Sequence, residues 1–468
     1  MYPDDQINTL AGEDTYALSD FRAFRANVVA KSSFTCTPIP FADSREWYFE
    51  NGILRHRSGG FFKLAGLRVQ ARTHELDGQE QLIILQPETA INGFLLRQRD
   101  DGCEILFQGR VEPGNIDAMQ LAPTVQSTEA NYKRVHGGGP TAFLEWFVTA
   151  HDAPALYDEL QSEEATRYYG KYNRNVVIDV SRQPDQPLPE NFRWYGIDAI
   201  RSFAVADNVL NTDARSVLAG LDWRFLAEGG RPFARHPAGS FGARLARSHD
   251  AGADLDDASD VEVLAWLTRL RVRSSPRHTV LPLDALSNWN TGADVIEERT
   301  REHGFCARQY AVHAEGREVA AWDQPLIDSD GVGRLVLAMQ ERAGVLRVLV
   351  KASHEIGFLE GVQCGASVTI VPGEAPAASD PVEEALLAAI DDSNRVQVLH
   401  RCRQSEEGGR FYHDENDYEI VELDSSLRVP DSPFYRWMTL AQVRRLISIP
   451  GTFSMEFRGV LALLLHYV

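Results

Sequence analysis

Residues 112–139 hold the side chains best suited to chemistry, in the stretch EPGNIDAMQLAPTVQSTEANYKRVHGGG. Polar groups outnumber apolar ones here, so the stretch lacks the apolar period of 2 or 3.6 that is typical of a core strand or helix. Polar groups are costly to bury without partners, and we therefore expect a polar ligand to bind them. A surface helix between two strands is the alternative interpretation. The candidate side chains are Glu112, Asn115, Gln120, Thr124, Gln126, Asn131, Tyr132, Arg134 and His136.

The composition limits the class of protein. The chain has 468 residues, 44% of them hydrophobic, which is long enough for two or three globular domains. A formal net charge of -20 argues against nucleic acid or an anionic membrane as a partner, because phosphate binding needs a basic face. No apolar run reaches the roughly 18 residues of a membrane helix. The cysteines show neither CxxC nor Cys/His spacing, so we expect no zinc site, no disulfide framework and a reducing cytoplasm.

The sequence contains a long internal repeat. Glu112 and Gly114 recur as Glu355 and Gly357, each 243 residues later. The same spacing links Gln120 with Gln363, Arg167 with Arg410, Asn173 with Asn416, and Arg215 with Arg458. Two pairs recur at slightly different spacings, Gln86-Pro87 with Gln324-Pro325 and Gly60-Phe61 with Gly304-Phe305. This register predicts a duplicated unit, with a first copy at residues 20–222 and a second copy at residues 262–468.

Each copy has the same predicted order of elements. An amphipathic helix is followed by alternating strands with a hairpin turn at Asp101-Gly102, then by a helical region, one more strand and two final helices. The helical region covers residues 155–169 in the first copy and 382–402 in the second. A sheet with flanking helices predicts the fold class α+β, with each copy an α/β/α sandwich of about 200 residues.

The predicted boundaries divide the chain into two modules and a linker. The modules cover residues 1–222 and 261–468, and the linker covers residues 223–260. This linker is rich in Gly, Ala, Arg and Asp, and we expect it to be poorly ordered.

The two copies differ where a ligand would bind. Asn115 corresponds to Phe358 in the second copy, and Gln126 corresponds to Thr369. The stretch 129–139 has no counterpart there. We therefore expect the working site in the first copy, with the second copy as support.

Several long motifs resemble those of one known family. EPGN, QLAPTVQST, NYKRVHGG, RSGGFF, SEEATRYYGKYNRN and NTDARSVL look like motifs of the NDP-hexose 2,3-dehydratases of deoxysugar biosynthesis. The resemblance covers nearly the whole chain apart from the linker. It implies two tandem Nudix-like modules related by internal duplication, and a homodimer.

The resemblance also implies a reaction. The substrate would be a nucleotide sugar of the dTDP-4-keto-6-deoxyglucose type. The enzyme, a lyase, would remove its C2 hydroxyl and leave a 3,4-diketo-2,6-dideoxy sugar. An NADPH-dependent ketoreductase partner would then reduce that product. The dehydration itself requires no metal or redox cofactor.

This reaction needs a base at C3, a donor to the C4 oxygen and an acid for the departing C2 hydroxyl. Glu112, Tyr132 and His136 are the candidates, and helical spacing would place Tyr132 and His136 on one face. Their ordinary alternatives are an ion pair, a packing ring and a turn histidine. Arg110 stands where the family commonly has Lys. Because Arg does not deprotonate in proteins, it would steady a phosphate or the C4 carbonyl.

Binding groups can be assigned by chemical type. Arg57 and Arg134 suit a diphosphate through bidentate contacts, with solvated surface arginines as the alternative. Trp47 and Phe61 suit stacking on a thymine base, although such aromatic residues are more often core. Amides and hydroxyls suit the sugar, and buried amides that bond loop backbone are the alternative. These polar candidates are Gln86, Asn115, Gln120, Thr124, Gln126 and Asn131.

Two other functions compete with the dehydratase interpretation. A Nudix-type nucleotide-sugar hydrolase needs Mg²⁺ held by clustered glutamates on a helix. The nearest acidic cluster, Glu159, Glu163 and Glu164, lacks that pattern and is interpreted as a solvated helix face. A non-catalytic nucleotide-sugar binding protein is the second alternative, because a fold can outlive its activity.

Overall fold

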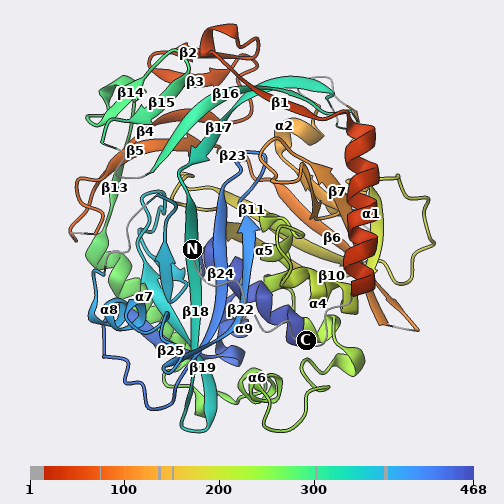
Figure 1. Ribbon diagram of the computed structural model, residues 1–468, viewed down its shortest axis with the longest axis vertical. Coiled ribbons are helices and arrows are strands. Elements are labelled where there is room, and N and C mark those ends of the chain that lie inside the picture. Colours follow the sequence, from red (N-terminus) through yellow and green to blue (C-terminus); the bar gives the residue numbers. More distant parts are fainter. Residues whose placement is uncertain are drawn as a thin grey trace.

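The structure is a computed structural model that describes residues 15–73, 75–100, 102–134, 139–149, 152–300, 304–315, 317, 319–373 and 378–468. Within these residues the protein is mixed α+β, and its strands form four sheets. Two larger sheets share one hydrophobic core, and two smaller sheets lie together at one end of the molecule (Figure 1). No helix in the described ranges is long and apolar enough to cross a membrane.

The larger sheet of the first copy has the strand order β10-β11-β6-β7-β12, with β8 beside β7 and β9 beside β6. Alternate side chains of a strand point to opposite faces. Phe94 and Phe107 therefore face helices α1, α4 and α5, whereas Leu95 and Leu106 face α3. The elements are α1 (Thr15–Ser32), β6 (Ile91–Arg99), β7 (Gly102–Val111), β8 (Met119–Ala122), β9 (Val125–Ser127), α2 (Glu129–Tyr132), α3 (Glu145–Val148), β10 (Ala155–Ser162), β11 (Tyr172–Asp179), β12 (Phe192–Gly196), α4 (Ile197–Ala204) and α5 (Thr212–Gly220). Asp101 of the predicted hairpin turn lies outside the described residues.

The larger sheet of the second copy repeats this plan, in the order β20-β19-β18-β24-β22 with β21 beside β18 and β25 beside β19. Helix α7 begins with a capping box in which Ser259 and Glu262 satisfy each other's backbone groups. Helices α5 and α10 pack against each other in the shared core. The elements are α7 (Asp260–Ser274), β18 (Val332–Arg342), β19 (Val345–Ser353), β20 (Gln363–Gly365), β21 (Val368–Ile370), α8 (Pro381–Leu387), β22 (Val396–Ser405), β24 (Glu415–Leu423), β25 (Tyr435–Thr439), α9 (Leu440–Leu446) and α10 (Met455–Leu461).

The two smaller sheets exchange one strand between the copies. Strand β1 of the first copy pairs with β16 of the second, and β13 of the second pairs with β4 of the first. The halves are therefore interlocked, and neither small sheet is complete without the other half. The strands are β1 (Thr35–Ile39), β2 (Trp47–Glu50), β3 (Ile53–His56), β4 (Lys63–Gln70), β5 (Glu80–Leu85), β13 (Arg277–Leu281), β14 (Trp289–Thr291), β15 (Val295–Glu298), β16 (Phe305–His313), β17 (Ala321–Ser329) and β23 (Phe411–Tyr412).

Matching contacts between the copies follow the 243-residue register. The Gly114 amide donates to Gly408 O at 2.8 Å, and the Gly357 amide donates to Ala165 O at 2.9 Å. A Cβ at Gly114 would lie 1.5 Å from Phe411 O, and one at Gly357 would lie 1.9 Å from Tyr168 O. The backbones therefore approach too closely for any residue but glycine.

The two pairs with irregular spacing were aligned wrongly. Gln81 Nε2 donates to Thr166 O, and Gln324 Nε2 donates to Gly409 O, 243 residues later. Gln81 is therefore the counterpart of Gln324, in place of Gln86. Similarly, Arg410 lies over the Phe62 ring as Arg167 lies over the Phe305 ring, so Phe62 takes the place assigned to Phe61.

One local prediction was wrong, and a second was right only in part. Residues 155–169, predicted as helical, begin with β10, because pairing with β11 overrides the helix-like spacing of their apolar residues. In the second copy the predicted helical region holds α8 and then β22.

Residues 223–260, expected to be poorly ordered, contain α6 (Phe241–His249) and buried side chains such as Trp223 and Leu245. Burial of these apolar groups fixes the segment against the shared core. The 3-10 turns are η1 (Phe41–Asp43), η2 (Trp223–Phe225), η3 (Glu228–Gly230), η4 (Ala253–Leu255), η5 (Leu283–Ala285) and η6 (Ala462–Tyr467).

Candidate active site

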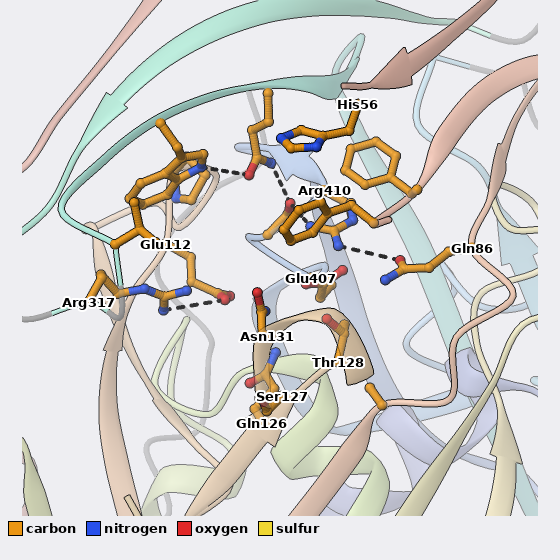
Figure 2. Close-up of a pocket in the computed structure, with 18 of the residues that line it drawn as sticks. His56, Gln86, Glu112, Gln126, Ser127, Thr128, Asn131, Arg317, Glu407 and Arg410 are labelled. Atoms are coloured by element: carbon orange, nitrogen blue, oxygen red, sulfur yellow. Dashed lines mark hydrogen bonds and ion pairs between the residues drawn. The ribbon is translucent and has the colours of Figure 1, made fainter. Parts of the chain in front are cut away.

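A cavity of about 440 Å³ lies where the small sheets meet the larger sheet of the first copy. The first copy provides most of its lining, including the loop after β7, the β9–α2 segment and residues from 163 to 173. The second copy provides the rest, from Arg317, residues 319–324 and residues 407–410 (Figure 2). Its contributions include Arg317, Trp322, Asp323, Gln324, Glu407, Gly409 and Arg410.

One part of the cavity is aromatic. The rings of Trp47 and Phe62 lie 4.6 Å apart, and so do those of His56 and Phe61. Trp47 is fixed because its Nε1 donates to Asp323 O at 2.8 Å. Such flat apolar faces can stack on a nucleobase.

Cations lie beside this aromatic part. The Arg410 guanidinium is 4.2 Å from the centre of the Phe62 ring, and its Nη2 donates to Gln86 Oε1 at 3.4 Å. Across the cavity, Arg317 points toward Glu112 (Figure 2). Arginines in such places suit phosphate oxygens.

Glu112 lies at the end of β7 and is held by two arginines. Its Oε1 accepts from Arg110 Nε at 2.7 Å and lies 3.8 Å from Arg317 Nη1. Asn115 shapes the loop that follows, because its Nδ2 donates to the carbonyls of Arg110 and Ala118 at 3.2 and 3.1 Å. The Glu112 carboxylate is thus neutralised by ion pairs.

The β9–α2 segment brings amides and hydroxyls to the cavity. Gln126 accepts from Asn211 Nδ2 at 2.8 Å, which fixes its amide, and Ser127, Thr128 and Asn131 follow along the wall. Figure 2 shows these groups below Glu407 and opposite Arg410. They suit the hydroxyls of a sugar.

Buried titratable groups complete the cavity. Burial, together with the nearby Glu407 carboxylate, raises the pKa of Glu163 to about 7. Burial, together with the nearby Glu163 and Glu407 carboxylates, raises the pKa of Asp213 well above its usual range. Burial lowers the pKa of Lys171, whose Nζ donates to Glu88 O. A proton can therefore be given or taken here near neutral pH.

Two of these carboxyls are held by amides. Asn92 Nδ2 donates to Asp213 Oδ1 at 2.6 Å, and Asn173 Nδ2 donates to Glu163 Oε2. The described residues contain no group of three or more His, Cys, Asp or Glu side chains arranged to hold a metal ion.

Comparison with known proteins gives the family. The model of the NDP-hexose 2,3-dehydratase family matches residues 18–221 and again residues 260–464. The chain belongs to this family. It is 34% identical over 453 residues to the dTDP-4-dehydro-6-deoxy-alpha-D-glucopyranose 2,3-dehydratase of Streptomyces violaceoruber, covering 94% of this chain and 96% of the relative.

Two other relatives of this 2,3-dehydratase family member carry the same name. The protein of Amycolatopsis orientalis is 32% identical, covering 95% of this chain and 89% of the relative. That of Saccharopolyspora spinosa is 30% identical, covering 95% and 90%. Among solved structures, an ADP compounds hydrolase matches with a TM-score of 0.23 and 17% identity, covering 38% of this chain and 89% of the other.

Seven of the residues predicted for the site line the cavity of this dehydratase family member. They are Trp47, Phe61, Gln86, Arg110, Glu112, Gln126 and Asn131. Glu112 has the ion pairs that were its ordinary alternative, so its position at the cavity does not by itself give it a role in proton transfer.

Six predicted residues lie elsewhere. Gln120 donates to Asn208 O and Ser405 Oγ, and Thr124 donates to Leu106 O, so both satisfy buried partners, as Asn115 does. Tyr132 is partly buried and packs against the core cluster on the far face of the sheet. Arg57 lies over the Tyr48 ring and Arg134 is exposed. His136 lies outside the described residues.

Sequence reasoning missed several buried groups of the cavity whose pKa values are shifted. Glu163 was assigned to a solvated helix face, but it is 5% exposed and lines the cavity. Tyr168 and Lys171 were not considered. A signal was present in the repeat, because Tyr168 corresponds to Phe411 and Lys171 corresponds to Asp414.

Proposed function

We propose that this chain dehydrates dTDP-4-keto-6-deoxyglucose to a 3,4-diketo-2,6-dideoxy nucleotide sugar. Family membership and the names of three relatives support this substrate. The observation in the structure that carries the proposal is a cavity in which buried carboxyls with raised pKa values lie beside arginines and a cluster of aromatic rings.

The reaction proceeds in two stages. A carboxylate removes the C3 proton, and the electron pair moves onto the C4 oxygen to give an enolate. The enolate then expels the C2 hydroxyl, which leaves as water after it receives a proton from an acid. The resulting enol takes up a proton at C2 and becomes the diketone. One water is lost and no electrons are gained, so the step is a hydro-lyase reaction.

The cavity offers a place for each part of the substrate. The thymine stacks against Trp47 and Phe61, and the diphosphate lies between Arg410 and Arg317. The sugar then reaches Gln126, Asn131 and the buried carboxyls. Gln86 orients Arg410 through its hydrogen bond.

The proposal extends to the origin of the chain. Two copies with the same strand order and a common register support an internal duplication, and we assign each copy a Nudix-like α/β/α sandwich. Assembly as a homodimer and an NADPH-dependent ketoreductase that consumes the diketone belong to the same proposal. Five free cysteines agree with a reducing cytoplasm.

One assay tests the reaction. The purified protein is incubated with dTDP-4-keto-6-deoxyglucose in buffer without added metal, and the product is trapped with borohydride. Loss of the C2 hydroxyl is the expected result. Release of dTMP would instead support hydrolysis, and binding without conversion would support a non-catalytic role; either result overturns the proposal.

A further inference from the structure

The duplication provides an internal comparison for every residue of the cavity. The counterpart of the cavity in the second copy is built from residues at the same register. A residue that differs between the two therefore indicates a feature that only one of them possesses. Tyr168 corresponds to Phe411, and Gly409 corresponds to Thr166. Both differences surround a single side chain of the second copy, Glu407.

Tyr168 fixes one oxygen of Glu407. Its Oη donates to Glu407 Oε2 at 2.7 Å across the boundary between the copies. Burial, and then the neighbouring Glu407 carboxylate, raises the pKa of Tyr168 well above its ordinary value, so the phenol stays protonated and remains a donor. The carboxylate is thereby held in one orientation.

Gly409 leaves the other oxygen open to the cavity. A Cβ at Gly409 would lie 2.4 Å from Glu407 Oε1 and 3.5 Å from Glu112 Oε1. The absent side chain therefore makes room next to this oxygen, and both Glu407 and Gly409 line the cavity. Among the described residues, none donates a hydrogen bond to Glu407 Oε1.

The counterpart of Glu407 in the first copy is Glu164, and its surroundings differ. Thr166 stands in place of the glycine, and its Oγ1 donates to Glu164 Oε1 at 2.5 Å. Phe411 stands in place of the tyrosine and has no hydroxyl to donate. Glu164 Oε2 is buried with no hydrogen-bond partner in the described part of the chain. Of these two glutamates, only Glu407 thus has one carboxylate oxygen held by a hydrogen bond from a tyrosine and the other open to the cavity.

Other carboxyls of the cavity are less suited to accept a proton from carbon. Glu112 is ion-paired with Arg110 and Arg317. Asp213 accepts from Asn92, and burial with the neighbouring carboxylates raises its pKa well above the usual range, which disfavours its charged form. Glu163 accepts from Asn173 and can carry a proton near pH 7, which suits the acid.

We propose that Glu407 of the second copy is the base that removes the C3 proton, and that Tyr168 of the first copy positions it. This inference rests on the proposed function. Glu407 Oε1 takes the proton from C3, the electron pair moves to the C4 oxygen, and Glu163 protonates the departing C2 hydroxyl. Glu407 then returns its proton to C2 as Glu163 regains one from the C3 enol hydroxyl. The second copy is thus part of the catalytic site.

The test compares Glu407→Gln with its matched control, Glu164→Gln, in the full chain. Glu407→Gln is expected to lower kcat by about 10³-fold, a typical size for a lost acid–base group. Affinity for dTDP, measured by calorimetry, is expected to stay within about threefold. Glu164→Gln is expected to keep most of the activity. Retained activity in Glu407→Gln, or equal losses in both variants, would overturn the proposal.

A second variant separates a base from a structural residue. In Glu407→Ala, formate added at high concentration is expected to restore part of kcat, because a small carboxylate can enter the space left by the side chain. Formate should not affect the wild type. A folded variant, judged by an unchanged melting profile and dTDP affinity, that gains nothing from formate would contradict the role of Glu407.

The positioning role has its own readout. Tyr168→Phe is expected to lower kcat by about tenfold to a hundredfold while KM changes less than about threefold, because only the orientation of Glu407 is lost. An unchanged kcat would show that Tyr168 does not position Glu407. If the wild-type chain does not dehydrate the substrate, the proposed function fails and this inference fails with it. If the wild type is active and Glu407→Gln is equally active, the inference fails alone.

Discussion

At the residue scale, charge distinguishes the cavity from its counterpart in the second copy. The cavity contains Arg110 and Lys171, whereas the same register places Ser353 and Asp414 in the counterpart. Burial raises the pKa of Asp414 to about 6, and it also raises the pKa of Glu355 well above its usual range. The counterpart is therefore rich in carboxyls and poor in cations, and it suits an anionic sugar nucleotide less well.

Removal of Arg410 should weaken nucleotide binding. We expect Arg410→Ala to raise the Kd for dTDP about tenfold, equal to about 1.4 kcal/mol, because a charge-assisted contact to the diphosphate is lost. Titration calorimetry measures the change. Arg99→Ala is the control, since Arg99 pairs with Asp185 on the surface away from the cavity. Equal affinity in Arg410→Ala and the wild type would contradict the placement of the diphosphate.

Asp414 should make stability depend on pH. Its folded pKa, about 6, lies above that of an unfolded Asp, near 3.9. The folded state therefore binds the proton more tightly than the unfolded state. The contribution of protonated Asp414 to the free energy of unfolding is complete below about pH 4 and is lost as the pH rises through 6. The loss is at most about 3 kcal/mol.

Urea unfolding at pH 5 and pH 8 tests this prediction. Asp414→Asn should lose less stability than the wild type between these pH values, because the amide has no proton to release. Glu145→Gln, at an exposed position, should behave like the wild type. An identical pH dependence in the wild type and Asp414→Asn would refute the assignment.

A residue of the cavity could be predicted from the sequence only where a local pattern marked it. Glu112, Gln126 and Asn131 stood out because polar groups interrupt the apolar pattern, and all three line the cavity. Glu407 gave no such signal, because its role comes from contact with Tyr168 of the other copy, and no local pattern encodes that contact.

At the element scale, the copies are joined where backbone meets backbone. The loop after β7 packs on residues 408–411, and the loop after β19 packs on residues 165–168. The sequence predicted the helices at both ends of each copy, because their apolar spacing is regular. It missed β10, because an edge strand is defined by pairing with β11 rather than by its own residues.

A methyl group at the contact should separate these loops. We expect Gly114→Ala to lower the free energy of unfolding by at least about 2 kcal/mol, because the added Cβ would overlap Phe411 O. Denaturant titration gives the value. Gly196→Ala is the comparison, since a Cβ there has 3.8 Å to Cys103 O. A Gly114→Ala variant as stable as Gly196→Ala would show that the loops can separate at little cost.

At the scale of the whole molecule, the strand exchange makes the copies interdependent. β1 completes a sheet of the second copy, β13 completes a sheet of the first, and one core runs through both larger sheets. The sequence repeat predicted two modules, but it could not predict the exchange of β1 and β13 between them. The alternating pattern of a strand does not show which distant strand it pairs with.

The interlocked copies should unfold as one unit. Calorimetry is expected to show a single transition in which the calorimetric and van't Hoff enthalpies agree. The reason is that neither copy keeps its small sheet when the other unfolds. Two separated transitions would mean that the exchanged strands contribute little.

The proposed dehydration is tested by proton NMR of the reaction carried out in D₂O with dTDP-4-keto-6-deoxyglucose. Dehydration by this mechanism is expected to remove the H3 signal and to turn C2 into a methylene, because C3 loses its proton and C2 exchanges its hydroxyl for a proton. A product whose C2 still carries its hydroxyl group, with the H3 signal intact or with dTMP released, would contradict the proposed mechanism.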